Sequence, residues 1–70
     1  MSLESLVREV QRRCVEFDTN VWEIADRHRW EYEDAFDFIG GYREPTQKML
    51  RDLAREFHIR AECLRETLDE

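Results

Sequence analysis

The chain has 70 residues, of which 41% are hydrophobic, and its 17 acidic and 11 basic residues give a formal net charge of −6. This length fits one domain with a single apolar core, which at this size supplies only about 3–5 kcal/mol of net stability. The acidic balance disfavours non-specific binding to nucleic acid or anionic membranes as the main function, and no apolar run reaches the roughly 18 residues of a membrane span.

Apolar residues recur at steps of three and four from the start of the chain, which predicts a first amphipathic helix of about four turns. Its inward face is predicted to be Leu3, Leu6, Val7, Val10, Cys14 and Phe17. Asn20 is a suitable N-cap for a second helix. The predicted inward face of that helix is Val21, Ile24, Ala25 and His28, and a short turn without glycine follows at residues 28–30.

The third helix is predicted from Glu31 to Ile39, because acidic residues favour a helix N-terminus and the pair Gly40-Gly41 favours a helix end. Thr46 is predicted to cap a fourth helix, and a fifth covers residues 61–68. No β-type alternation or repeat interrupts this pattern. The predicted fold is therefore all-α, with five helices in one domain of residues 1–70. The predicted core is Val10, Cys14, Ile24, Ala25, Trp30, Ala35, Phe38, Leu50, Leu53, Phe57, Ile59 and Leu64.

Residues 20–68 resemble the small helix-turn-helix regulators of the Cro and lambda-repressor (XRE) class. Ile24-Ala25 matches the apolar-Ala pair of the family's second helix, and Pro45 follows Ala25 by 45 − 25 = 20 residues. Pro45 lies in a basic-x-Pro-Thr sequence at residues 43–46, as in the family's loop. The fourth and fifth helices are most similar to those of host-inhibition-of-growth antitoxins. The matching apolar positions there are Leu50, Leu53, Ala54, Phe57, Ile59 and Leu64.

This resemblance implies a compact lambda-repressor-like fold in which residues 31–39 are the recognition helix, the element that enters the DNA major groove. The helix lacks the Arg, Lys, Asn, Gln, Ser and Thr that usually read bases, and it carries four carboxylates. Two unit charges about 6 Å apart repel by roughly 3 kcal/mol at an effective dielectric of about 20, so these groups oppose binding to phosphates. The residues predicted to face outward are Tyr32, Glu33, Asp34, Phe36 and Asp37.

Aromatic residues suggest a different function for the same helix. Tyr32 and Phe36, spaced i, i+4, are predicted to stack on its exposed side, near Trp22 and Tyr42. Aromatic rings surrounded by charge are typical of a protein interface. We therefore expect binding of a basic protein partner or toxin, as in an antirepressor, adaptor or antitoxin, through Trp22, Tyr32, Glu33, Asp34, Phe36, Asp37 and Tyr42. The alternatives are a merely solvated helix face and, from the family, a dimeric sequence-specific DNA-binding repressor.

In the resembled family, the start of the second helix and the loop after the third helix touch phosphates. The candidate phosphate contacts in this sequence are Arg27, Arg29, Arg43 and Lys48. The alternative is that they form ion pairs with neighbouring carboxylates, which would contribute little stability each. The neighbouring carboxylates in the sequence are Glu23, Asp26, Glu44 and Asp52.

Cysteine and histidine supply metal-ligand types, but no two of them have the close spacing of structural zinc sites. Cys14 and Cys63 are predicted to be small apolar fillers, with metal or redox chemistry as the alternative. His28 is predicted to be a half-buried, hydrogen-bonded residue rather than a pH sensor.

No catalytic constellation is recognisable, so we expect neither an enzyme nor a cofactor or metal. Without a signal peptide, a cytoplasmic location with reduced thiols is expected. A homodimer is expected through the last helix with its Leu68, or through the aromatic residues.

Overall fold

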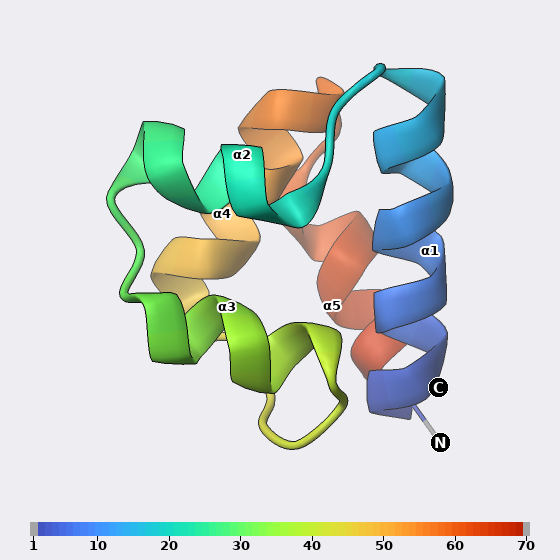
Figure 1. The fold of residues 1–70 in the computed structure, drawn as a ribbon. Coiled ribbons are helices and arrows are strands. Elements are labelled where there is room, and N and C mark those ends of the chain that lie inside the picture. Colours follow the sequence, from blue (N-terminus) through green and yellow to red (C-terminus); the bar gives the residue numbers. More distant parts are fainter. Residues whose placement is uncertain (1, 70) are drawn as a thin grey trace.

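Five helices and no strand make up residues 2–69, the part of the chain that the computed structural model describes (Figure 1). The helices are α1 (Ser2–Glu16), α2 (Val21–His28), α3 (Tyr32–Ile39), α4 (Gln47–Phe57) and α5 (Ala61–Asp69). The prediction of an all-α chain with five helices is confirmed. The expected domain bounds include Met1 and Glu70, which lie outside the described residues.

α4 packs against α1, α2 and α5, and α1 also packs against α2 and α5. In Figure 1, α1 and α5 lie side by side, while α2 and α3 form the opposite part of the molecule and contact each other. The whole domain measures 28 × 24 × 20 Å. Within residues 2–69, none of the helices is both long enough and apolar enough to cross a membrane.

Side chains cap two of the helices at the residues predicted from the sequence. The side chain of Asn20 accepts a hydrogen bond from the backbone amide of Glu23 at 2.9 Å, and that of Thr46 accepts one from Met49 at 3.1 Å. Each supplies an acceptor for an amide that the first helical turn leaves unpaired. These caps set the starts of α2 and α4.

Three helices end at a residue other than glycine in the left-handed backbone region: Asp18, Arg29 and His58 have φ angles of +54°, +60° and +57°. In each case the next amide donates to a carbonyl five residues earlier, which closes the helix end in a Schellman motif. These bonds join Thr19 to Cys14 (2.9 Å), Trp30 to Ala25 (2.9 Å) and Ile59 to Ala54 (3.0 Å). The chain therefore passes from α2 to α3 in three residues without glycine.

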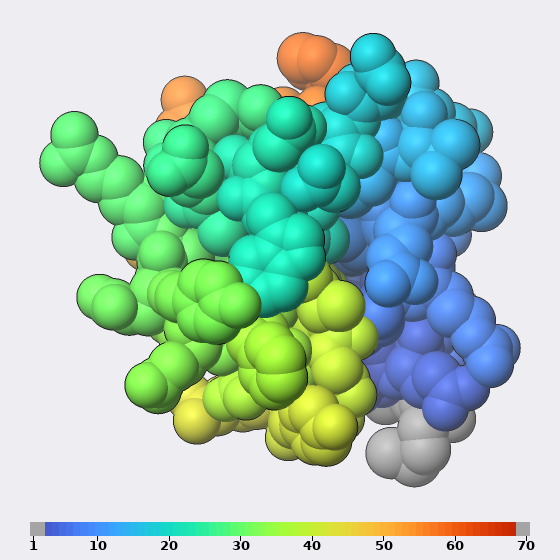
Figure 2. Space-filling view, viewed as in Figure 1, coloured from blue at the N-terminus to red at the C-terminus, as the bar shows by residue number. Residues whose placement is uncertain are grey.

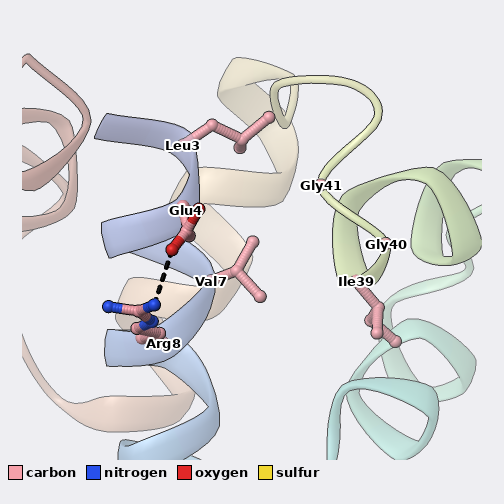
Figure 3. A pocket seen from close by; sticks show the side chains of 7 residues that line it. All are labelled: Leu3, Glu4, Val7, Arg8, Ile39, Gly40 and Gly41. Carbon is pink, nitrogen blue, oxygen red and sulfur yellow. Dashed lines mark hydrogen bonds and ion pairs between the residues drawn. The ribbon is translucent and has the colours of Figure 1, made fainter. Parts of the chain in front are cut away.

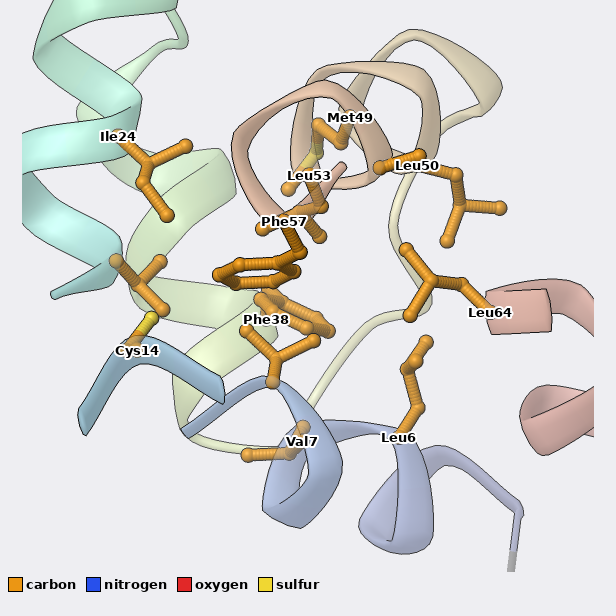
Figure 4. Packing of buried hydrophobic residues seen from close by; sticks show 13 residues of the cluster. Leu6, Val7, Cys14, Ile24, Phe38, Met49, Leu50, Leu53, Phe57 and Leu64 are labelled. Carbon is orange, nitrogen blue, oxygen red and sulfur yellow. The ribbon is translucent and has the colours of Figure 1, made fainter. Parts of the chain in front are cut away.

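The core lies where the apolar sides of the helices meet, with Phe38 of α3 and Phe57 of α4 among the residues at its centre (Figure 4). All the predicted core residues are buried except Trp30 and Ile59, which are half-buried and pack against the core. The predicted inward faces of the first two helices supply the further buried residues Leu6, Val7 and Val21, and Met49 and Ala54 of α4 are buried as well.

Two residues predicted to face the interior lie at the surface instead. Phe17 follows the last residue of α1 and is 42% exposed, although its ring still contacts that of Phe57, with centroids 5.7 Å apart. Cys63 is exposed because Leu64 occupies the side of α5 that faces the core, so its prediction as an apolar filler is wrong. Cys14 is buried as predicted, and this burial raises the pKa of its thiol.

Candidate functional site

The outward side of α3 forms one face of the molecule together with α2 and the loop after α3 (Figure 2). α3 takes this orientation because Ala35 and Phe38, on its other side, are 0% and 1% exposed. Tyr32 and Phe36 are left 72% and 52% exposed. We define the acidic–aromatic face as Trp22, Tyr32, Glu33, Asp34, Phe36, Asp37 and Tyr42.

The four aromatic rings of this face form two packed pairs. The ring centroids of Trp22 and Tyr32 are 5.1 Å apart, and those of Phe36 and Tyr42 are 6.3 Å apart with planes only 15° from parallel. Both distances lie in the range of favourable aromatic contacts. The predicted stack of Tyr32 on Phe36 is therefore wrong, because α2 and the loop bring other rings closer to each of them.

Two glycines place Tyr42 beside α3. Gly41 has a φ angle of +75°, which glycine adopts at little cost, and the amide of Tyr42 then donates to the carbonyl of Asp37 at 2.8 Å. A Cβ atom on Gly40 would collide with the ring of Tyr42. The glycine pair thus ends the helix, as predicted, and also makes room for the ring that packs on Phe36.

Arg43 partly neutralises the carboxylates of the face. Its Nη1 lies 3.6 Å from Oδ1 of Asp34 and its Nη2 lies 3.1 Å from Oδ2 of Asp37. The expected pairing of Arg43 with the adjacent Glu44 is wrong, because the tight turn brings residue 43 back against the end of α3. Glu33 is exposed and forms no ion pair within residues 2–69. Three carboxylates and one guanidinium leave this face with a net negative charge.

Apart from the acidic–aromatic face, a cluster of polar side chains joins α2 to α4. It is centred on Asp52, which is only 9% exposed. Its Oδ2 accepts hydrogen bonds from Nε1 of Trp30 at 2.9 Å and from Nζ of Lys48 at 2.7 Å. Burial opposes ionisation of Asp52, but the bonds from Lys48 and Trp30 outweigh it and lower the pKa of the carboxyl below its ordinary value of 3.8. The Lys48–Asp52 pair confirms the expectation of an ion pair at this position.

Glu56 lies one turn further along α4 and belongs to the same cluster, where it binds Arg27 and His28 of α2. Arg27 donates to both of its carboxylate oxygens, at 3.2 and 2.8 Å, and Nε2 of His28 lies 2.7 Å from Oε2. The bonds from Arg27 lower the pKa of Glu56 below 4.5, against the opposing effect of burial. His28 is half-buried and hydrogen-bonded, as predicted. The expectation that Arg27 pairs with Glu23 or Asp26 is wrong, because Glu56 faces it across the contact between the two helices.

The four candidate phosphate contacts therefore have different surroundings. Arg27, Arg43 and Lys48 form ion pairs with carboxylates of their own chain. Arg29 is exposed and forms no ion pair in the part of the chain that the structure describes. Sequence reasoning missed Glu56, although its spacing of four residues from Asp52 and eight from Lys48 places all three on one side of α4.

An apolar groove runs between the start of α1 and the end of α3 (Figure 3). The hollow between these two helix ends has a volume of about 350 Å³ and is bordered by the ion pair of Arg8 with Glu4. A second hollow of about 230 Å³ also reaches Ile39 and extends along α1 toward Trp22. Because Arg8 and Glu4 neutralise each other, the groove offers apolar contact without a charge preference. Its apolar lining includes Leu3, Val7, Cys14, Val15, Val21 and Ile39.

Comparisons of the chain with protein-family models, with curated proteins and with solved structures found no match. Among residues 2–69, no three His, Cys, Asp or Glu side chains gather in a way that could hold a metal ion. The acidic–aromatic face is the candidate functional site.

Proposed function

We propose that this chain is a protein-binding module whose acidic–aromatic face docks on a basic protein partner. The observation that carries the proposal is the arrangement of four exposed rings, between 40% and 75% exposed, in two packed pairs on one face. Large rings held in place on the surface lose little conformational freedom on binding and bury much apolar area, as the anchors of protein interfaces do.

The carboxylates around these rings define the charge of the partner. Glu33, Asp34 and Asp37 lie among the rings, and Arg43 offsets only part of their charge. Such groups speed association with a positively charged surface and fix its orientation more than they add affinity. A basic protein therefore fits this face better than a neutral one.

We further propose that the fold is of the lambda-repressor-like helix-turn-helix type. In support, α2 and α3 are short helices in contact, joined by three residues, and α4 and α5 follow. Under this proposal α3 occupies the place of a DNA-reading helix, but its side chains suit protein rather than phosphate. Function follows the site and not the fold, so we favour an antirepressor, adaptor or antitoxin-like role over operator binding.

The charge distribution supports this preference. Cations that bind DNA gain affinity by displacing counterions from phosphates. Arg27, Arg43 and Lys48 are instead engaged by Glu56, Asp37 and Asp52. Binding DNA through them would require breaking these pairs next to the carboxylates of α3.

The test compares the wild-type chain with the double variant Tyr32→Ala/Phe36→Ala in capturing proteins from cells that encode it. Proteins captured only by the wild type are then titrated in purified form. We expect the double variant to lose binding while keeping its helicity, because both rings are exposed. Val15→Ala, which truncates an 80% exposed side chain on α1, is the control for loss of exposed apolar surface and should bind normally.

A titration with short duplexes from the chain's own promoter region, at low and at moderate salt, tests the DNA alternative. The proposal expects no saturable, sequence-selective binding at moderate salt. Selective binding that survives moderate salt and is lost on changing Tyr32, Glu33 or Asp37 would overturn it.

A homodimer remains part of the proposal. Four exposed rings on a domain of 70 residues offer one surface for it, and α5 offers another. Sedimentation that gives a monomer at high micromolar concentration would remove the homodimer without affecting the partner-binding proposal.

A further inference from the structure

The outward side of α3 contains a hollow with an unusual combination of walls. Tyr32 and Phe36, one helical turn apart, supply two rings, and Glu33 and Asp37, also one turn apart, supply two carboxylates. These four side chains line a depression of about 300 Å³. The hollow thus combines aromatic surface with negative charge on a single helix.

The neighbouring rings hold these walls in place. Trp22 packs against Tyr32, and Tyr42 lies nearly parallel to Phe36. Tyr32 and Phe36 are therefore supported from α2 and from the loop, while both still line the hollow. A binding surface whose rings are already fixed loses less entropy when a ligand enters.

The chemistry of the walls selects among possible occupants. A purely apolar side chain would remove water from the carboxylates of Glu33 and Asp37 without compensating them. A lysine ammonium would compensate the charge, but its compact, strongly hydrated head gains less from the rings. A guanidinium group can donate hydrogen bonds to carboxylates from its edge while its flat faces stack on aromatic rings.

The molecule already binds one guanidinium group at the edge of this hollow. Arg43 lies within 3.6 Å of Asp34 and 3.1 Å of Asp37, on the side where the chain leaves α3. Glu33 lies one helical turn before Asp37, lines the same hollow and forms no ion pair among residues 2–69. One further cation can therefore be accepted beside Glu33, between the two rings.

We propose that this hollow receives an arginine side chain of the partner protein. The proposal rests on the proposed function, and it adds the chemical identity of the group that anchors the partner. Tyr32 and Phe36 stack on the guanidinium group, and Glu33 accepts its hydrogen bonds. Asp37 contributes charge while it remains paired with Arg43.

The probes are three capped pentapeptides of alanine with a central arginine, lysine or citrulline, titrated into the isotopically labelled full chain and followed by NMR. We expect the arginine peptide to shift the backbone amides of residues 32–37 in a saturable way. Citrulline keeps the shape of arginine but lacks its charge, and should not bind. Lysine should bind at least about five-fold more weakly, since it loses the stacking and the bidentate hydrogen bonds.

Matched variants locate the effect. Glu33→Gln should weaken binding of the arginine peptide, and Tyr32→Ala/Phe36→Ala should abolish the shifts. Glu66→Gln, at an exposed glutamate of α5, is the charge control and should bind like the wild type. Equal binding of the arginine and lysine peptides, or equal weakening by Glu33→Gln and Glu66→Gln, would show general attraction to an acidic protein and overturn the proposal. So would the absence of any saturable shift.

The failure of this inference can be told apart from failure of the proposed function. If the captured partner still requires Tyr32 and Phe36 but the arginine peptide does not bind, the arginine subsite is wrong and the protein-binding function stands. If neither the partner nor the peptide depends on these rings, both proposals fail.

Discussion

Removal of the Asp52 carboxylate should destabilise the fold more than the loss of a single exposed polar side chain usually does. In Asp52→Ala the half-buried Nε1–H of Trp30 loses the acceptor it had at 2.9 Å. Leaving such a donor unsatisfied costs about 1–3 kcal/mol. Lys48 also loses its partner, but its side chain is 57% exposed and regains water, so this loss adds only about 0–1 kcal/mol. The expected total is about 1–4 kcal/mol.

Thermal and urea denaturation followed by circular dichroism measures this effect. For a domain of this size each kcal/mol corresponds to about 4–8 °C, so Tm should fall by at least about 4 °C and by up to about 30 °C. Asp52→Asn keeps an oxygen that can accept from Trp30 and should lose only about half as much stability. Asp26→Ala is the control, because Asp26 is exposed and forms no ion pair among residues 2–69, and it should change stability by less than about 0.5 kcal/mol.

The pH dependence gives an independent check of the same carboxylate. The pKa of Asp52 is lower in the folded chain than its ordinary value of 3.8, so the unfolded chain binds the proton more readily. The stabilisation is therefore complete well above pH 3.8 and is lost as the pH falls through the folded value. Asp52→Ala should show a smaller loss of stability between neutral and acidic pH than the wild type. An Asp52→Ala melting temperature indistinguishable from that of Asp26→Ala, with unchanged acid sensitivity, would refute the reasoning.

Three other changes test the core, a turn and the face. Leu53→Ala should lower the free energy of unfolding by about 2–5 kcal/mol in urea denaturation, since Leu53 is 0% exposed and its loss leaves a cavity. His58→Gly should raise the free energy of unfolding by about 0.5–1 kcal/mol, because relief of the strain of a left-handed backbone at residue 58 exceeds the entropy that glycine adds to the unfolded chain. A clear loss of stability in this variant would contradict this account. Gly40→Ala should leave the domain folded, since φ is −76° at Gly40, but should weaken partner and arginine-peptide binding in titrations by displacing Tyr42 from Phe36. Unchanged binding would show that Tyr42 is not needed to support the hollow.

Local sequence determined the helices and their inner faces. Asn20 and Thr46 cap helices at the predicted positions, because an N-cap acts on an amide three residues away. The glycine pair at 40–41 ends α3 for a similar local reason. The inward faces followed from the helical period, and so the burial of residues such as Ile24 and Leu53 could be predicted without any knowledge of how the helices pack.

The residues of the acidic–aromatic face could also be named from the sequence, but their arrangement could not. Tyr32 and Phe36 are neighbours on one helix, yet their rings pack on Trp22 and Tyr42. The position of Trp22 depends on how α2 lies against α3, and that of Tyr42 on the backward turn after Gly41. The hollow on α3 therefore became visible only in the folded chain.

The tertiary structure alone decided which polar groups far apart in the sequence meet. Arg27 pairs with Glu56 across 29 residues and Trp30 with Asp52 across 22, whereas sequence reasoning placed the partner of Arg27 nearby. Pairing over such distances is set by the packing of α2 on α4, which the buried apolar side chains determine. Charged side chains then pair with whichever groups that packing brings within reach, because exposed pairs are too weak to direct the fold themselves.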